Sequence, residues 1–328
     1  MNYQELAQKV IGGYAVSPAE ALLIITTEDK DIYTLLDAAN TVRFKYKGKK
    51  IRLCAISNAK SGRCSENCSF CAQSSHHKTK VETYPLVSEN EIVTYAKDAE
   101  KDMQATCFSI VTSGKTVHSE DDLNTIGNAV KKISNETGMN RCVSLGTLSK
   151  EQIIKLKNSG LKRLHHNLET AKSFFNNVCG THSYEERVAT IKAAKEAGLE
   201  VCSGGIFGLG ESEEQRIEFA FELKELGVES VPINILNPVE GTPAAKNYKP
   251  MRPLDILKLI AAYRFILPKQ DIGILGGREL NLRHLQPLIF PAGANVILIG
   301  NYLTTKGQSP EKDLEMIRDL GLEIESNV

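Results

Sequence analysis

The chain has 328 residues, 41% of them hydrophobic and 24% charged, which is the composition of an ordinary globular protein. Its 40 basic residues balance 40 acidic ones, so the zero net charge argues against nucleic acid or an anionic membrane surface as the main partner, since both require a basic face. No apolar run reaches the roughly 18 residues of a membrane span, and no secretory signal is visible, so we expect a cytoplasmic protein.

The first 50 residues are predicted to be helical. Apolar residues recur at helical spacing over residues 3–11 and 31–44. Between these segments, Ser17-Pro18-Ala19-Glu20 forms a capping box with proline at the first helical position, which predicts a helix that ends near residue 26. We therefore expect residues 1–50 to form a helical extension that precedes the main domain.

After residue 50, short β-like runs alternate with helical patterns. The predicted strands are residues 51–57, 105–112, 141–145, 163–167, 200–206, 230–236, 271–275 and 294–298. The predicted helices between them are residues 88–101, 120–137, 149–159, 183–197, 213–226 and 254–266. Eight strands that alternate with helices indicate a parallel sheet closed into a (βα)8 TIM-type barrel of the α/β class. We predict that this barrel spans residues 51–322 and precedes a C-terminal tail, residues 323–328.

Three of the eight cysteines are clustered in a polar loop after the first predicted strand: Cys64, Cys68 and Cys71. A chain of this length does not need disulfides, and clustered cysteines in a cytosolic protein more often bind metal. A closed zinc site needs four ligands, and no fourth cysteine or histidine is suitably spaced. Three thiolates on a 4Fe–4S cluster leave one iron open to a small molecule, so the number of ligands favours iron–sulfur over zinc.

The spacing Cys64-x3-Cys68-x2-Cys71 resembles the signature of the radical S-adenosylmethionine (SAM) superfamily. The resemblance implies that the open iron binds SAM and that an electron from the cluster cleaves SAM to a 5′-deoxyadenosyl radical. It also implies that SAM and the clusters carry the chemistry and that no side chain is itself catalytic. A barrel suits such chemistry, because its walls shield the radical from solvent.

Three further cysteines each fall in a predicted strand: Cys107, Cys142 and Cys202. The residue two positions after each cysteine is small, a serine in the first two strands and a glycine in the third. Side chains two positions apart share one face of a strand. A close-packed barrel interior has no reason for such small residues unless something else fills the space. Each cysteine alone is compatible with ordinary burial, but the repeated pattern predicts a second cluster inside the barrel.

The chain resembles the biotin synthase family from about residue 51 to residue 322. The resemblance rests on CSENCSFCAQSS (64–75), CVSLGTL (142–148), VCSGGIFGLGE (201–211), VPINIL (231–236), GTP (241–243), GGRE (276–279) and AGAN (292–295). It implies an enzyme that inserts sulfur into dethiobiotin to form biotin, with an auxiliary iron–sulfur cluster as the sulfur source. It also implies SAM as a cofactor, an electron donor of the flavodoxin or ferredoxin type, and a homodimer.

The same resemblance assigns roles to individual residues. Glu169 would bind the SAM ribose, where the family usually has aspartate, and Arg187 would pair with the SAM carboxylate. Asn167 would contact both the ribose and the substrate. The segment near the adenine would comprise Gly204, Ile206, Gly208 and Glu211. The ureido group of dethiobiotin would contact Asn167, His165 and Asn234. The ligands of the auxiliary cluster would be Cys107, Cys142, Cys202 and Arg278.

Cys54, in the first predicted strand, departs from the family, which usually has serine there. Ala105 and Val296 also replace polar residues that commonly support the arginine ligand. Two interpretations follow. Cys54 is either a buried replacement for serine, with Arg278 on a 2Fe–2S cluster, or the fourth thiolate of a four-iron auxiliary cluster, with Arg278 outside the ligand set. We favour the second. Cys179 lies outside both cysteine sets in the sequence and is expected to be dispensable.

Other functions are compatible with parts of these patterns. A related radical SAM enzyme, of the hydrogenase-maturation or methylornithine-forming kind, would share the barrel and the first three cysteines but not the full auxiliary set. A non-catalytic iron–sulfur electron carrier, or a zinc-stabilised binding protein, would have no need of a substrate-sized interior. The interior of the barrel therefore discriminates between these alternatives.

Overall fold

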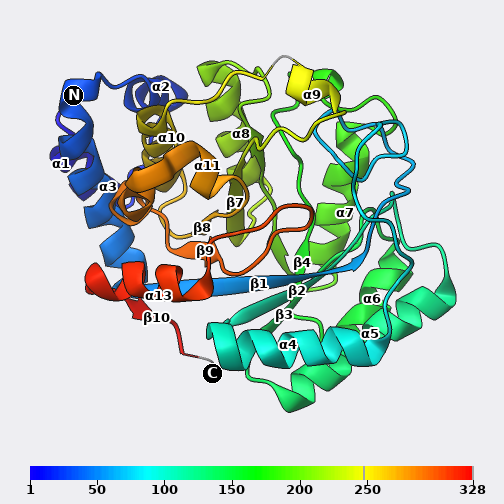
Figure 1. Cartoon of the computed structure of the whole chain (residues 1–328). Coiled ribbons are helices and arrows are strands. Elements are labelled where there is room, and N and C mark those ends of the chain that lie inside the picture. Colours follow the sequence, from blue (N-terminus) through cyan, green and yellow to red (C-terminus); the bar gives the residue numbers. More distant parts are fainter. Residues whose placement is uncertain (247, 327–328) are drawn as a thin grey trace.

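The structure is a computed structural model that describes residues 1–246 and 248–326. Its strands form a closed parallel barrel (Figure 1). In chain order the strands are β1 (Lys50–Lys60), β2 (Cys107–Thr112), β3 (Asn140–Ser144), β4 (Arg163–His165), β5 (Glu200–Cys202), β6 (Gly205–Phe207), β7 (Ser230–Ile235), β8 (Asp271–Ile274) and β9 (Val296–Leu298). Pairing of β1 with β9 closes the barrel, and β5 and β6 share one wall position beside β7. The predicted (βα)8 barrel is confirmed.

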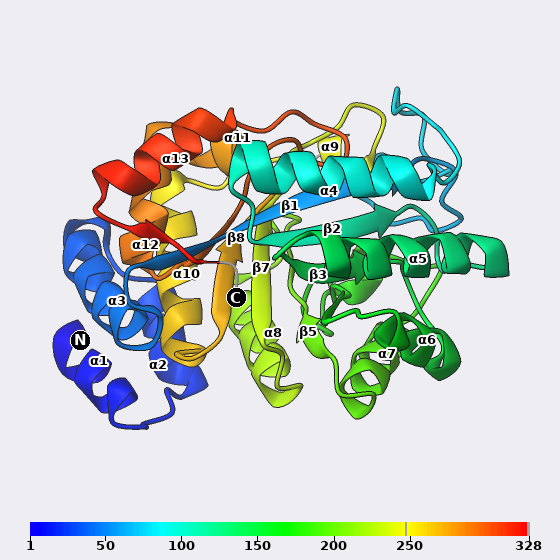
Figure 2. The same ribbon diagram turned by 90° about the horizontal axis from the view of Figure 1, so that it is seen from below.

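Helices between the strands cover the outside of the barrel, as Figure 2 shows from below. They are α4 (Glu89–Met103), α5 (Glu120–Glu136), α6 (Lys150–Asn158), α7 (Tyr184–Glu196), α8 (Glu213–Glu225) and α10 (Pro253–Ile266). Four of them begin with a capping box in which serine is followed three residues later by glutamate or glutamine. Each cap satisfies backbone N–H groups that the helix leaves unpaired, and contributes about 1 kcal/mol.

The N-terminal extension consists of α1 (Tyr3–Ile11), α2 (Pro18–Ile25) and α3 (Ile32–Lys47), with the short 3-10 helix η1 (Asp29–Asp31) before α3. Helices α2 and α3 pack against α10, so α10 lies between the extension and the barrel. Every residue of α10 from Ile256 to Ile266 is buried. This burial explains why α10 is apolar nearly all round instead of amphipathic.

The remaining elements lie in connecting loops and in the C-terminal part. They are η2 (Phe175–Asn177), α9 (Pro243–Lys246), α11 (Arg278–Leu282), η3 (Arg283–Leu288), α12 (Ile289–Ala292), α13 (Pro310–Asp319) and β10 (Glu323–Ile324). Strand β10 pairs with the start of β1, so the predicted tail begins with a short strand. The end of that tail, residues 327–328, lies outside the described residues. None of the described helices is long and apolar enough to cross a membrane.

Buried charges close the barrel at the end where its strands begin. Arg52 on β1 pairs with Asp271 on β8 and, at 2.6 Å, with Glu325 beyond β10. Lys47 also contacts Asp271, at 2.8 Å, and Asn295 donates a hydrogen bond to the same carboxylate. The arginine and lysine hold the pKa of Asp271 well below its usual range, although burial opposes them. These ion pairs fill the end of the barrel where the strands begin. The functional site is therefore expected at the end where the strands finish, as in other barrels.

Candidate active site inside the barrel

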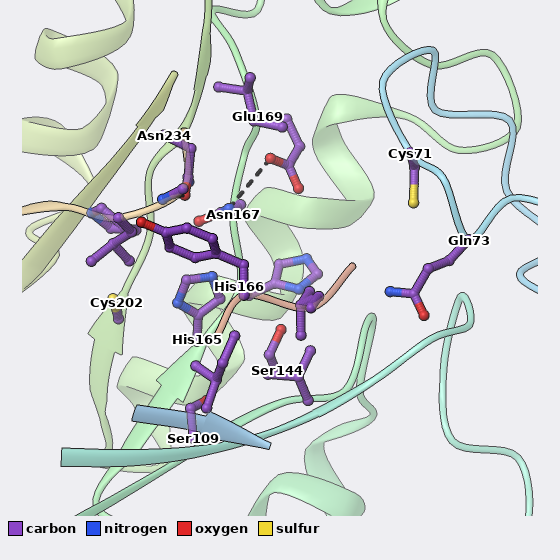
Figure 3. Close-up of a pocket in the computed structure, with 18 of the residues that line it drawn as sticks. Cys71, Gln73, Ser109, Ser144, His165, His166, Asn167, Glu169, Cys202 and Asn234 are labelled. Atoms are coloured by element: carbon purple, nitrogen blue, oxygen red, sulfur yellow. Dashed lines mark hydrogen bonds between the residues drawn. The ribbon is translucent and has the colours of Figure 1, made fainter. Parts of the chain in front are cut away.

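A cavity of about 430 Å³ lies inside the barrel and extends to the loops at the strand ends. Seven cysteines line it in two groups: Cys64, Cys68 and Cys71 from the loop after β1, and Cys54, Cys107, Cys142 and Cys202 from the barrel wall. In Figure 3, Cys71 and Cys202 face the cavity from opposite sides, with His165, His166 and Asn167 between them. The cavity is of the size that usually holds a small-molecule ligand.

The cysteine loop folds back on itself, which brings its three thiols to one side of the cavity. The backbone N–H of Cys64 donates to the carbonyl of Gln73 at 3.0 Å, and Ser75 donates to the carbonyl of Cys64 at 2.8 Å. Burial raises the pKa of Cys71 to about 11, because it disfavours the charged thiolate. Binding of the thiolate to a metal offsets this cost. None of the eight cysteines, all of which are described, is in a disulfide. Three free thiols on one cavity fit a 4Fe–4S cluster with an open iron.

The four wall cysteines are brought together by the register of the strands. Cys54 on β1 is in register with Cys107 on β2, and the proximity of the two buried thiols raises the pKa of Cys54 and lowers that of Cys107. Cys142 on β3 is in register with Ser109, two residues beyond Cys107, and Cys202 on β5 is in register with His165 on β4. All four thiols line the same cavity, and this donor set fits an inorganic cluster held by thiolates.

Arg278 is not among the residues that line the cavity, and its role as a cluster ligand stays a prediction. It follows β8 after Gly277, which has a positive φ of 77°, and starts α11. The Nη2 of Arg278 donates to both carboxylate oxygens of Asp313 at 2.9 Å, and the side chain is fully buried. The turn at Gly277 thus directs Nη2 of Arg278 toward α13, while its Nε and Nη1 are buried without a hydrogen-bond partner among the described residues.

The GGRE segment instead positions the loop that covers part of the cavity. Glu279 accepts hydrogen bonds from the Tyr302 hydroxyl, at 2.7 Å and 2.8 Å, and from the backbone of Gln308 at 3.0 Å. Residues 302–305 line the cavity. The Arg278–Asp313 and Glu279–Tyr302 contacts together hold this loop over the barrel.

Two glycines allow the chain to pass close to its neighbours beside the cavity. A Cβ atom on Gly204 would lie 2.0 Å from the carbonyl oxygen of Pro232, and one on Gly205 would lie 2.1 Å from that of Glu169. Glu169 itself has a φ of 74°, which is uncommon for a residue with a side chain and costs about 1–3 kcal/mol. This local strain fits a binding role for Glu169.

Asn167, Glu169 and Arg187 lie together on the cavity, as the resemblance implied. Asn167 donates to Glu169 at 3.3 Å, the contact that Figure 3 marks. The Nη1 of Arg187 donates to the backbone carbonyl of Asn167 at 2.7 Å, and lies 3.6 Å from Glu169. His182 holds the other edge of Arg187, because Nε2 of His182 accepts from Nε of Arg187 at 2.8 Å.

The segment predicted to approach the adenine lies on the cavity only at Ile206. The carboxylate of Glu211 accepts from the backbone N–H groups of Gly208 and Leu209, both at 2.8 Å, and from Arg216 at 2.8 Å. Gly204 and Gly208 are likewise outside the described cavity lining. The expected contacts of Gly204, Gly208 and Glu211 with the cofactor stay predictions, and in the structure Glu211 holds the turn at Gly208 and Leu209 that follows β6.

His165 and Asn234, the predicted substrate residues, both line the cavity. Asn234 donates to the carbonyl of Gly205 at 3.1 Å and accepts from the N–H of Gly276 at 2.9 Å. These contacts orient the amide and leave one N–H and one acceptor site for a ligand. Burial lowers the pKa of His165, so its imidazole is neutral at pH 7.

Cys179 lies beside the first cysteine group, which corrects the expectation that it stands apart. Its sulfur, the Cys68 sulfur and a ring nitrogen of His182 all lie within 4.8 Å of one another. His182 accepts from Arg187 through Nε2, so its proton is on Nδ1, which faces Glu66. A protonated nitrogen is not a metal ligand, and the trio therefore fits a hydrogen-bond network better than a metal site.

Among the cavity residues that the sequence analysis did not single out, His166 and Arg163 stand out chemically. His166 lines the cavity, and its Nε2 is buried without a hydrogen-bond partner among the described residues. Arg163 also lines the cavity, beside the wall cysteines. Strand periodicity places Arg163 on the same face as His165, which was the available signal. His166 follows the end of β4, so alternation did not predict its direction.

Replacing His182 by glutamine should weaken SAM binding, because Arg187 would lose the ring that orients its guanidinium. We expect the SAM concentration for half-maximal 5′-deoxyadenosine formation to rise about tenfold, the effect of losing roughly 1.4 kcal/mol from a charged hydrogen bond. The matched variant Arg187→Lys should show a larger increase. An unchanged SAM dependence in the His182 variant would contradict this role.

Comparison with known proteins identifies the family of the chain. Residues 59–223 match the Radical SAM superfamily, and residues 232–323 match the Biotin and Thiamin Synthesis associated domain. The chain is 48% identical to a biotin synthase of Geotalea daltonii over 326 residues, which covers 99% of this chain and 98% of the relative. It is 50% identical to a biotin synthase of Geobacter sulfurreducens over 325 residues, with the same coverage of each chain.

Solved structures with the same fold have other functions. A crystal structure of methylornithine synthase matches with a TM-score of 0.86 at 21% identity, covering 98% of both chains. The FeFe-hydrogenase maturase HydG from Carboxydothermus hydrogenoformans matches with a TM-score of 0.80 at 20% identity, covering 98% of this chain and 79% of that chain. These likenesses show the barrel fold alone. The near full-length identity to the curated relatives, in contrast, shows that the chain belongs to the biotin synthase family of the radical SAM superfamily.

Proposed function

We propose that this chain converts dethiobiotin to biotin by inserting sulfur, with SAM and two iron–sulfur clusters bound in one barrel cavity. The observation that carries the proposal is the pair of cysteine groups on that cavity, three on the loop and four on the wall. When bound, the two clusters and SAM supply the reductive cleavage, the hydrogen-abstracting radical and the sulfur atom. An electron carrier needs neither a cavity of this size nor the polar groups between the cysteines.

The chain's own residues bind and orient the two small molecules. Arg187 presents a guanidinium whose position is set by His182 and the Asn167 backbone, which suits a carboxylate such as that of SAM. Glu169 offers carboxylate oxygens to ribose hydroxyls. Between these groups and the wall cysteines, His165 and Asn234 offer neutral donors and acceptors, which suit the uncharged ureido group of dethiobiotin.

We infer that Cys54, Cys107, Cys142 and Cys202 hold a four-iron auxiliary cluster. The presence of four thiols on the wall of one cavity supports this assignment, and so does the ion pair of Arg278 with Asp313. The two cysteine groups lie at different parts of one cavity, with the ligand-binding residues between them (Figure 3). A radical formed near the first group can then meet a substrate that also contacts the second.

The organisation of the whole protein follows from the same proposal. Residues 51–322 would form the catalytic barrel, and residues 1–50 would support it by packing on α10. An electron donor of the flavodoxin or ferredoxin type would reduce the loop cluster. We further propose a cytoplasmic homodimer, on the strength of the family resemblance.

The proposal is tested by incubating the anaerobic, reduced protein with SAM and dethiobiotin. Formation of both 5′-deoxyadenosine and biotin is expected. A preparation with both clusters intact that forms neither product would refute the assignment. Formation of 5′-deoxyadenosine without biotin, when other candidate substrates are converted, would assign the chain to a different reaction on the same barrel.

A further inference from the structure

Arg163 places a positive charge next to the wall cysteines. It is the first residue of β4, its side chain lines the cavity, and only 6% of the residue is exposed. Its backbone is in register with Cys142 on one side and with Glu200 on the other. Two N–H groups of Arg163, Nε and Nη2, donate to one oxygen of Glu200 at 3.0 Å and 2.6 Å. Among the described residues, its Nη1 has no hydrogen-bond partner.

The strand register places Arg163 among the wall cysteines. It is level with Cys142 on β3, and Cys202 on β5 is level with His165, two residues further along β4. Negative charge on these thiols and on Glu200 raises the pKa of Arg163, although burial opposes it. Arg52 is the other arginine near these cysteines, but it is engaged by both Asp271 and Glu325 and does not line the cavity. Arg163 has one acidic partner, and that side chain is 55% exposed.

We propose that Arg163 compensates the charge of the auxiliary cluster, with Nη1 donating toward the cluster's sulfur atoms and raising its reduction potential. The inference rests on the proposed ligand set. Four thiolates around an iron–sulfur core carry net negative charge, and burying such a charge is costly unless a cation lies beside it. Hydrogen bonds to sulfur and nearby charges are among the factors that set the potential of such clusters. Arg163 is thus a positioning and tuning residue, and no bond to iron is required of it.

The test is a redox titration of the auxiliary cluster in the holoenzyme, followed by Mössbauer and electron paramagnetic resonance spectroscopy. Removing the charge in Arg163→Gln should shift the potential to more negative values. At a fixed solution potential, the ratio of reduced to oxidised auxiliary cluster should fall about tenfold, as expected for one charge at close range in a medium of intermediate dielectric constant. Arg163→Lys, which keeps the charge, should remain close to the wild type.

A matched control is available on the neighbouring strand. Arg141 precedes Cys142 on β3, but it donates to the backbone carbonyls of Met139 and Gly160 and does not line the cavity. Arg141→Gln also removes one arginine from this wall, and should leave the potential unchanged. Glu200→Gln should shift the potential in the opposite direction to Arg163→Gln, because it removes the charge that partly neutralises Arg163. The shift should be smaller, since Glu200 is half exposed and is screened.

The outcomes separate this inference from the ligand assignment. A wild-type potential in a fully loaded Arg163→Gln protein overturns the inference, as do shifts of the same sign in the Arg163 and Glu200 variants. If the Arg163→Gln protein fails to retain the auxiliary iron, the iron content of the Arg163→Lys protein tests the inference instead. Iron retained with lysine supports charge compensation, and iron lost with lysine as well overturns it. A spectrum unchanged by Cys54→Ser would refute the four-thiolate ligand set without affecting the Arg163 measurement.

Discussion

Replacement of Cys68 by alanine should abolish reductive cleavage of SAM. Cys68 is one of three thiols that the folded loop presents to a single cavity, and a 4Fe–4S core with an open iron needs all three. Losing a residue that only supports a metal ligand typically lowers activity about 10- to 100-fold. We expect 5′-deoxyadenosine formation to fall by more than that, because a ligand itself is lost. The same result is expected for Cys64→Ala and Cys71→Ala. The measurement is 5′-deoxyadenosine release under reducing, anaerobic conditions, together with iron content.

Cys179→Ala is the matched control for the loop cysteines. Its thiol lies beside Cys68 and contacts His182, with sulfur 3.2 Å from Nδ1, but it does not line the cavity. If Cys179 is only a hydrogen-bonding neighbour, the variant should keep the iron of the loop cluster and most of its SAM cleavage. Loss of that iron in the Cys179 variant, with full activity retained by Cys68→Ala, would show that the ligand assignment is wrong.

Replacement of Cys54 by serine should selectively remove the auxiliary cluster. The wild-type protein, isolated anaerobically, should contain about eight irons per chain, as expected for two four-iron clusters. The variant should lose the auxiliary portion and biotin formation, and should retain the loop cluster with its SAM cleavage. Iron and sulfide analysis with Mössbauer spectra would measure both. About six irons per chain, unchanged by the mutation, would contradict the four-thiolate cluster and leave Cys54 as a packing residue.

Arg278→Met is the comparison that separates the two interpretations of the fourth ligand. The structure places Arg278 against Asp313 and outside the cavity lining, so the auxiliary spectrum should persist in this variant. Breaking this buried ion pair should instead lower the stability of the protein by about 3–5 kcal/mol, because Asp313 would remain buried without its partner. Thermal unfolding of the loaded protein measures that loss. Disappearance of the auxiliary spectrum at normal stability would restore Arg278 as a ligand.

Local sequence determined most of the architecture and the first cysteine site. The four capping boxes and the strand periodicity are local signals, and the eight predicted strands and the helices between them are present. The Cys64-x3-Cys68-x2-Cys71 spacing is also local, because a loop of eight residues can bring three thiols together without help from distant parts of the chain. Alternation along the strands indicated a shared face for Cys107, Cys142 and Cys202, and all three line the cavity.

The tertiary structure decided what depends on contacts between distant segments. Arg278 lies four residues after a strand that lines the cavity, and its direction was set by the turn at Gly277 and by Asp313, 35 residues away. Cys179 and Asn67 lie 112 residues apart, and they meet only when the loop after β1 packs against the segment before α7. Spacing in a sequence constrains neighbours along one element, whereas side chains on different elements meet according to packing and register. The ion pair of Arg278 with Asp313, and the place of Arg163 beside Cys142, therefore became visible only in the folded barrel.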